Sequence, residues 1–373
     1  MELNIILKGN ALEVLKTLPN SFIDCVMTSP PYYMLRDYGE NAKCDTWQGQ
    51  LGLEPSWELY VQHLTQIFEE VKRILKDSGS LWLNIGDTYF NNNHHKEKSY
   101  FKGLLALKNN VYKQKCLMGI PWRVAFELIK NGWILRNAVI WYKPNHMPAS
   151  VKDRLTNTYE YIFHFVKSQK YYYNLNTIRI PFKTTFDLEN ERIRKLINRL
   201  YEIVTQIRNQ VNSNGKSNNV SGWTGTSIHR NAYHKALKIL EQEETLTNTE
   251  KKFLTEYAYK HLSHPEGINP GDLFEINTRP YHGAHFAVFP PELCIVPILA
   301  TCPPNGIVAD IFAGAGTTLA VAKALGRKYI GIEIVDKYIN IAEKRLKKLE
   351  WPLMSITKRK DAEDAIKRIY MGA

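Results

Sequence analysis

The hydrophobic positions in the first half of the chain follow two alternating spacings. Short apolar runs favour buried strands, whereas apolar residues three or four positions apart favour amphipathic helices. Strands are expected at Ile23–Met27, Leu81–Ile85, Asn137–Trp141 and Tyr159–Val166, and helices at Glu58–Lys76, closed by Asp77-Ser78-Gly79, and at Trp122–Lys130, closed by Asn131-Gly132. This alternation predicts a parallel or mixed sheet with helices on both faces.

The pattern changes between residues 183 and 270 and then returns. The middle segment is polar and charged, and it predicts amphipathic helices at Leu188–Val211 and His234–Lys260 with a long Gly-, Ser- and Asn-rich loop between them. Alternation resumes with strands at Ile307–Phe312 and Tyr329–Ile334 and helices at Thr317–Leu325 and Asp336–Leu349. We therefore predict one α/β domain, formed by residues 1–180 and 276–350, with a mainly helical or irregular insert at 181–275 and a basic tail at 351–373.

Composition narrows the class of protein. The 373 residues carry a formal charge of +12, which favours a polyanionic partner, although charge alone does not single out nucleic acid. No run approaches the ~18 apolar residues of a membrane span, and the first residues lack a signal-peptide pattern, so we expect a cytoplasmic protein without membrane association. The five cysteines are scattered without a C-x-x-C pair, which argues against disulfides and against a metal site.

Residues 308–334 combine a strand, a Gly-rich turn, a helix and a second strand. Gly314 and Gly316 allow a ligand to approach the backbone, and the following helix offers free N–H groups and the positive end of its dipole. Glu333 stands where an acidic side chain binds ribose hydroxyls in nucleotide-binding folds. The pattern predicts a nucleoside-type cofactor and leaves NAD and S-adenosylmethionine open, although Leu319 at the third glycine position counts against a dinucleotide.

The first predicted strand leads directly into Ser29-Pro30-Pro31-Tyr32. The prolines fix φ and remove N–H donors, which leaves backbone carbonyls and the Ser29 hydroxyl to face a cleft. Such acceptors suit a planar exocyclic amino group, and Tyr32 offers a ring on which a flat base can stack. A rigid turn with a packed tyrosine is the alternative for this tetrapeptide taken alone.

Together these two patterns resemble the amino-methylating DNA methyltransferases, which methylate N4 of cytosine or N6 of adenine. Ser29-Pro30-Pro31-Tyr32 matches their catalytic motif (Asp/Asn/Ser)-Pro-Pro-(Tyr/Phe/Trp), and Asp310–Thr317 matches their cofactor motif around Phe-x-Gly-x-Gly. The catalytic motif comes first in the chain, as it does in the family's β group. The resemblance implies a Rossmann-like fold and S-adenosylmethionine as cofactor.

The resemblance also implies roles for single residues. It assigns catalysis to Ser29, Pro30, Pro31 and Tyr32, and cofactor binding to Asp310, Phe312, Gly314, Gly316, Thr317 and Glu333, with Phe289 and Pro290 at the methionine end. Relatives often have Gly-Asp where this chain has Gly9-Asn10. Asn10 is therefore expected to contact the cofactor without supplying a charge.

Serine at the first motif position is, in this family, more usual among enzymes that methylate N4 of cytosine. Ser29 therefore predicts a cytosine N4 target, with N6 of adenine as the alternative. The implied reaction is in-line attack of the amine on the sulfonium methyl group, after the base is flipped out of the duplex onto Tyr32. Cytosine C5 chemistry would need a Pro-Cys nucleophile, and the chain has no such dipeptide.

The insert at 181–275 is expected to be the target-recognition region, with double-stranded DNA as partner. Trp223, His229 and Arg230 are candidates for DNA contacts, either with base edges or with phosphates. The family further implies a restriction–modification system with a cognate endonuclease as candidate partner, and a monomer or homodimer.

Three other readings remain open from the sequence. Related Pro-Pro-Tyr motifs serve amine methylation of RNA or protein, although the order of the motifs and the place of the insert favour DNA. A DNA-binding protein on an inactive methyltransferase scaffold is the non-enzymatic alternative, and the intact motifs argue against it. An NAD-dependent enzyme is the third.

Overall fold

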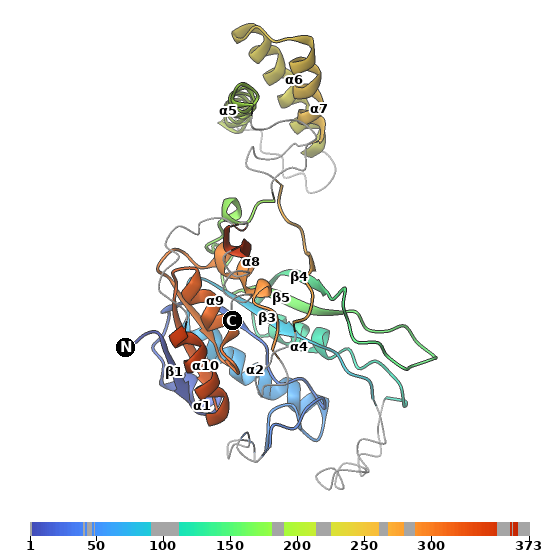
Figure 1. Ribbon diagram of the computed structural model, residues 1–373, viewed down its shortest axis with the longest axis vertical. Helices are drawn as coiled ribbons and strands as arrows, with labels where there is room; N and C mark the ends of the chain where they lie inside the picture. The colour runs from blue at the N-terminus through green and yellow to red at the C-terminus, as the bar shows by residue number, and fades with distance from the viewer. Residues whose placement is uncertain are drawn as a thin grey trace. The chain divides into compact units, whose positions relative to one another are not determined.

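The computed structural model describes residues 2–39, 42, 47, 49–90, 112–180, 190–213, 225–260, 268–279, 288–348, 359 and 361–364. The chain divides into two compact units, of which unit 1 comprises residues 1–178 and 271–373 and unit 2 comprises residues 179–270 (Figure 1). Among the described residues no helix is long and apolar enough to cross a membrane.

Unit 1 is built on a sheet of eight strands in the order β1-β8-β7-β2-β3-β5-β4-β6. The strands are β1 (Ile5–Lys8), β2 (Ile23–Thr28), β3 (Leu75–Ile85), β4 (Ile134–Tyr142), β5 (Tyr159–Val166), β6 (Leu273–Glu275), β7 (Ile307–Asp310) and β8 (Lys328–Glu333). Neighbouring strands run parallel except that β5 is antiparallel to both β3 and β4. The predicted mixed α/β sheet is confirmed.

Helices cover both faces of this sheet (Figure 1). One core contains α1 (Ala11–Thr17), α2 (Trp57–Ile74) and α4 (Ile120–Lys130), and the other contains α8 (Glu292–Thr301), α9 (Thr317–Ala324) and α10 (Asp336–Lys348). Successive side chains of a strand enter opposite cores, as Val26 and Met27 of β2 do. The centre of the sheet is therefore buried on both sides, and a ligand is expected at its strand ends.

Unit 2 contains the helices α5 (Glu191–Ser213), α6 (Gly225–Glu243) and α7 (Asn248–Lys260). They share an apolar core of their own, which includes the buried Leu200, Val204, Leu240 and Leu254. Ion pairs join α5 to the other two helices, between Arg199 and Glu243 and between Arg192 and Glu250. Such a core makes unit 2 a structural module in its own right.

The helical pattern of the insert was only partly predicted. The expected helix His234–Lys260 is in fact two helices, because Thr247 and Glu250 form a capping box that begins α7. The loop expected between residues 212 and 234 is also shorter, since α6 begins at Gly225.

Three other features of unit 1 differ from the sequence prediction. Asp77-Ser78-Gly79 do not follow a helix as a turn but lie inside β3, where the register against β2 shifts. The strands β1 and β6 and the helices α1 and α8 were not predicted. Since Leu273–Glu275 pair with β4, the last residues of the proposed 181–275 insert belong to the sheet, and unit 2 ends at Pro270. Most of the proposed basic tail at 351–373 lies outside the described residues.

Candidate active site

The two sequence motifs meet at the carboxyl ends of neighbouring parallel strands. β2 pairs with β7 through Cys25 and Val308, so the turns that follow the two strands lie together. The Thr28 hydroxyl at the end of β2 donates a 2.7 Å hydrogen bond to Asp310 Oδ1 at the end of β7. Residues far apart in the sequence thus share one edge of the sheet, as ligand sites in open α/β sheets require.

Asp310 acts in the structure as a buried support of both turns. Its carboxylate also accepts a hydrogen bond of 3.1 Å from the backbone N–H of Phe312. Burial raises its pKa to about 6. Asp310 does not line the cavity described below. The structure therefore places this predicted cofactor-binding residue behind the turn.

The Gly-rich turn after β7 is shaped by backbone hydrogen bonds to Glu333. The Glu333 carboxylate accepts hydrogen bonds from the backbone N–H groups of Gly314 at 2.8 Å, Ile334 at 3.0 Å and Val335 at 2.9 Å. Burial of the carboxylate is the largest influence on its pKa, which is raised. Gly316 ends the turn with φ of +73°, and a Cβ there would lie 2.8 Å from Ala342 Cβ, so a larger residue does not fit.

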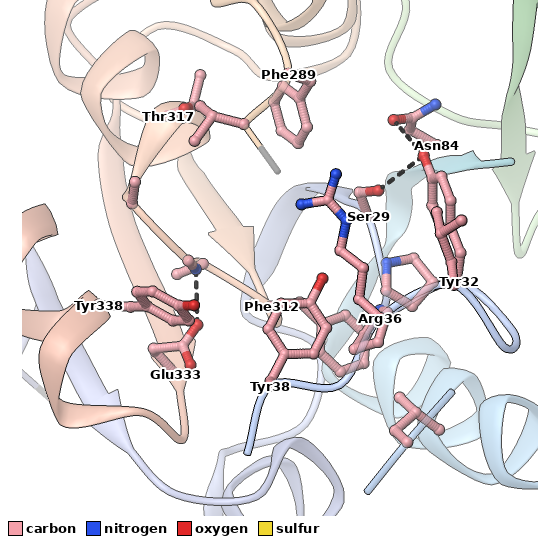
Figure 2. A pocket seen from close by; sticks show the side chains of 18 of the residues that line it. Ser29, Tyr32, Arg36, Tyr38, Asn84, Phe289, Phe312, Thr317, Glu333 and Tyr338 are labelled. Carbon is pink, nitrogen blue, oxygen red and sulfur yellow. Dashed lines mark hydrogen bonds between the residues drawn. The ribbon is translucent and has the colours of Figure 1, made fainter. Parts of the chain in front are cut away.

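The turn after β2 is held by side chains from distant parts of the chain. Tyr60 on α2 donates a 2.8 Å hydrogen bond to the carbonyl oxygen of Pro31. The Tyr32 hydroxyl donates to Glu160 Oε2 at 2.6 Å. Ser29 Oγ donates to the Tyr32 hydroxyl at 3.4 Å (Figure 2). The result is a continuous path of hydroxyl groups from Ser29 to a carboxylate.

Glu160 is itself held in place by two neighbours. Lys143 pairs with its Oε1, and Asn84 Nδ2 donates to its Oε2 at 3.2 Å. The Tyr32 pKa is raised well above its ordinary value, first by burial and then by the Glu160 charge. Tyr32 therefore remains a neutral hydroxyl.

The position of the Tyr32 ring depends on a glycine. A Cβ at Gly86 would lie 2.6 Å from the ring carbon Cε2, so only glycine lets the ring pack against this backbone. Tyr32 also lines the cavity at the sheet edge.

A cavity of about 710 Å³ joins the two turns (Figure 2). The sequence-predicted residues that line it are Asn10, Ser29, Pro30, Pro31, Tyr32, Phe289, Phe312, Gly314, Thr317 and Glu333. Pro290, Asp310 and Gly316 are absent from this lining. Asn10 lines it, but its side chain caps α1 by accepting from Leu12 N at 2.9 Å. The volume is in the range of small-molecule sites, roughly 300–1,000 Å³.

Several lining residues were not assigned to the site from the sequence. They are Arg36, Tyr38, Asn84, Lys143, Arg279 and Tyr338. Strand pairing explains why Asn84 and Lys143 lie at the site, because β3 and β4 end beside β5, which carries Glu160. The one available signal was the position of Asn84 and Lys143 at strand ends. The DNA-contact candidates remain unplaced: Trp223 lies outside the described residues, and His229 and Arg230 lie on α6 with their side chains not described.

Comparison with known proteins identifies the family to which this site belongs. Residues 23–344 match the family model of the N6/N4 methyltransferases, described as DNA methylase. The chain belongs to this DNA methylase family. It is therefore a DNA methyltransferase that acts on exocyclic amines, and the family expected from the sequence is confirmed.

Individual relatives extend over almost the whole chain. The type II methyltransferase M.SfiI of Streptomyces fimbriatus is 34% identical over 388 residues, which cover 89% of this chain and 88% of the relative. M.Cfr9I of Citrobacter freundii is 33% identical over 354 residues, covering 93% and 89%. Among solved structures, the PvuII DNA methyltransferase (cytosine-N4-specific) superposes with a TM-score of 0.54 at 17% identity over 100% of this chain and 98% of that one. This last likeness concerns the fold alone.

Proposed function

We propose that this methyltransferase transfers a methyl group from S-adenosylmethionine to N4 of a cytosine flipped out of double-stranded DNA. The observation that carries the proposal is Ser29, a neutral hydroxyl placed at the first position of the motif beside Tyr32. Its relatives are type II methyltransferases, so we further propose a role in a cytoplasmic restriction–modification system with a cognate endonuclease. N6 of adenine remains the second candidate, because its amine presents similar hydrogen-bonding geometry.

The cavity fits the cofactor in its dimensions and its chemistry. S-adenosylmethionine supplies an electrophilic methyl group on a sulfonium. Glu333 and the N–H groups at the start of α9 suit the nucleoside end, and Phe312 supplies apolar surface in the same cavity. Phe289, which also lines the cavity, remains our candidate for the methionine end. Ser29 and Tyr32 line the same cavity at the other turn, where the target base would enter.

Ser29 and the Pro30 carbonyl are the proposed acceptors for the two protons of the target amine. The Ser29 hydroxyl directs its own proton to Tyr32, which leaves its lone pairs free to accept. Two such hydrogen bonds orient the amine and favour a more tetrahedral, more nucleophilic nitrogen. Tyr32 stacks on the flipped base and holds it in this orientation.

The same hydroxyl path provides an exit for the proton. Formation of the N–C bond and cleavage of the S–C bond leave the nitrogen with one proton in excess. That proton passes to Ser29 Oγ as the Ser29 proton moves to Tyr32 and the Tyr32 proton moves to Glu160, along contacts of 3.4 and 2.6 Å. Lys143 and Asn84 keep the Glu160 carboxylate aligned to receive it.

Unit 2 is the proposed target-recognition module, in keeping with its position between the two motifs and its separate core. Trp223, His229 and Arg230 remain our candidates there for contacts with DNA. We propose a monomer or a homodimer.

The decisive experiment is mass spectrometry of nucleosides from duplex DNA incubated with the protein and S-adenosylmethionine. N4-methylcytosine is the expected product. N6-methyladenine would keep the family and overturn the assignment of the base. Neither product, on DNA of varied sequence, would overturn the proposed reaction.

A further inference from the structure

The side chain of Arg36 enters the cavity from a clamped backbone. The Gln50 side chain, itself buried, donates to the Arg36 carbonyl oxygen at 3.0 Å and accepts from the Tyr38 N–H at 2.8 Å. One amide group thus fixes the chain on both sides of the arginine. Figure 2 shows the guanidinium extending into the cavity, between the part with Ser29 and the part with Glu333.

In the part of the chain that the structure describes, Arg36 differs from the other cavity-lining lysine and arginine in having no ion pair with a carboxylate. Among the described residues, Lys143 pairs with Glu160 and Arg279 pairs with Glu292, while Arg36 forms no ion pair and its buried Nη1 has no hydrogen-bond partner. A buried donor without a partner is costly, and an unpaired guanidinium more so. Such a group suits an anionic ligand that enters the cavity.

We infer that Arg36 binds the carboxylate of the methionine part of S-adenosylmethionine. The inference rests on the proposed function, which places the cofactor in this cavity. Its methyl group must reach Ser29 while its nucleoside lies at Glu333, so the sulfur and the short amino-acid chain occupy the space between them. The carboxylate is the one anionic group on the cofactor, and a planar guanidinium binds it with two parallel hydrogen bonds.

Decarboxylated S-adenosylmethionine isolates this contact, because it lacks the carboxylate and keeps the sulfonium, the amine and the nucleoside. Isothermal titration should show that Arg36→Gln weakens S-adenosylmethionine by roughly 10- to 100-fold and leaves the decarboxylated compound unchanged. Arg136→Gln, at an arginine that contacts Tyr171 and does not line the cavity, is the matched control and should change the affinity for neither compound.

Equal weakening of the binding of both compounds, or no weakening of either, would overturn the inference. If the wild type bound neither compound, the proposed placement of the cofactor, and with it the proposed function, would be overturned as well.

An independent observation concerns the connection between β4 and β5, residues 143–158. Leu155 on this connection is 90% exposed. Its neighbours are anchored: Asp153 pairs with Lys115, Arg154 stacks over the Tyr89 ring at 3.9 Å, and Asn157 accepts from the Tyr89 hydroxyl at 3.0 Å. An apolar side chain is thus presented to solvent by a braced backbone.

The same connection borders the cavity. Asn145, His146, Met147 and Asn157 line it, and Met147 is 87% exposed. Lys152 and Arg154 stand beside Leu155 in a chain with a formal charge of +12. A duplex that delivers a base to Ser29 would therefore meet a basic loop with a projecting leucine.

We propose that Leu155 inserts into the base stack at the place that the flipped base leaves, as apolar wedges do in other protein–DNA complexes. The proposal rests on the DNA substrate and base flipping proposed above. The wedge would offset part of the unstacking cost, which is least for a mispaired base.

Two duplexes test the wedge: the site that the wild type methylates, and the same site with the target base mispaired. Leu155→Ala should lower kcat/KM on the paired duplex by roughly tenfold or more and on the mispaired duplex by much less. Leu273→Ala, at a 61% exposed leucine that does not line the cavity, should change neither rate.

An equal loss of kcat/KM on both duplexes, or no loss, would overturn the proposed wedge. A change of sedimentation coefficient in Leu155→Ala would assign the leucine to a contact between copies instead. Absence of methylation by the wild type would overturn the proposed function as well.

Discussion

The two turns that meet at the active site are stabilised in different ways. The cofactor turn after β7 depends on glycines and on Glu333, which lies 19 residues from Gly314. The catalytic turn after β2 depends on Tyr60, Asn84 and Glu160, which lie 29, 52 and 128 residues from the turn residues they contact. The first turn is a local property of one strand–helix–strand unit, and the second is assembled by the whole sheet.

This difference predicts different consequences of mutation. A change in the cofactor turn should act through backbone geometry and abolish binding. A change in the catalytic turn should remove one side chain from a network and leave the cofactor in place.

The largest effect is expected from Gly314→Val. A β-branched residue at φ of +49° is strained, and Gly314 lines the cavity, so a distorted turn changes the wall of the site. We expect the Kd for S-adenosylmethionine, measured by calorimetry, to rise by ~100-fold or more. Gly326→Val is the control, since it has φ of +69° in open space outside the cavity and should cost stability without affecting binding. Similar binding by the two variants would contradict a special role of the cofactor turn.

Ser29→Ala should come next. Loss of the hydroxyl removes an acceptor for the target amine and the first member of the proton path. Methyl transfer should fall by about 10²- to 10³-fold in single-turnover assays, while the Kd for the cofactor stays within about twofold. Full activity of the variant would refute the proposed mechanism.

Tyr32→Phe sharpens the comparison within the catalytic turn, because it keeps the ring for stacking and removes the hydroxyl. The path from Ser29 to Glu160 is then interrupted. We expect the rate of methyl transfer to fall by about tenfold or more, with the KM for DNA little changed. Tyr60→Phe, which removes only the hydrogen bond to Pro31, should instead cost about 1 kcal/mol of stability. Equal kinetic effects of the two variants would argue that Tyr32 has a structural role only.

The smallest effect concerns Asp310, which joins the two turns. Its pKa of about 6 lies above the ordinary value of 3.8, so the folded protein takes up a proton there before the unfolded chain does. The contribution of this group to stability therefore increases as the pH falls from 7 towards 4. Relative to Asp310→Asn, the wild type should gain about 1 kcal/mol between pH 7 and pH 5 in urea unfolding. If the free energies of unfolding of the wild type and Asp310→Asn changed in parallel with pH, the raised pKa of Asp310 would be contradicted.

The same contrast between local and distant contacts explains which parts of the structure the sequence predicts. The unit from β7 to α10 follows from its own residues, because strand, glycine turn, helix and acidic residue are consecutive. The role of Glu160 does not follow, since it becomes a partner of Tyr32 only when β5 pairs antiparallel to β3.

The placement of Asp310 shows a second limit. A match to the cofactor motif assigns it to ligand binding, but residue type alone does not reveal that Thr28 and Phe312 occupy its carboxylate. Short elements such as β1 and β6 were missed because three or four residues show too little periodicity.

The two ends of unit 2 are joined to each other by backbone hydrogen bonds. Ile180 and Ile268 exchange two backbone hydrogen bonds, of 3.0 and 2.9 Å, so the chain leaves and re-enters unit 2 through a closed pair of residues. The residues between them carry their own core. We therefore expect that segments of different length can replace the residues between Ile180 and Ile268, because the paired ends would remain the points where the chain leaves and re-enters the sheet unit.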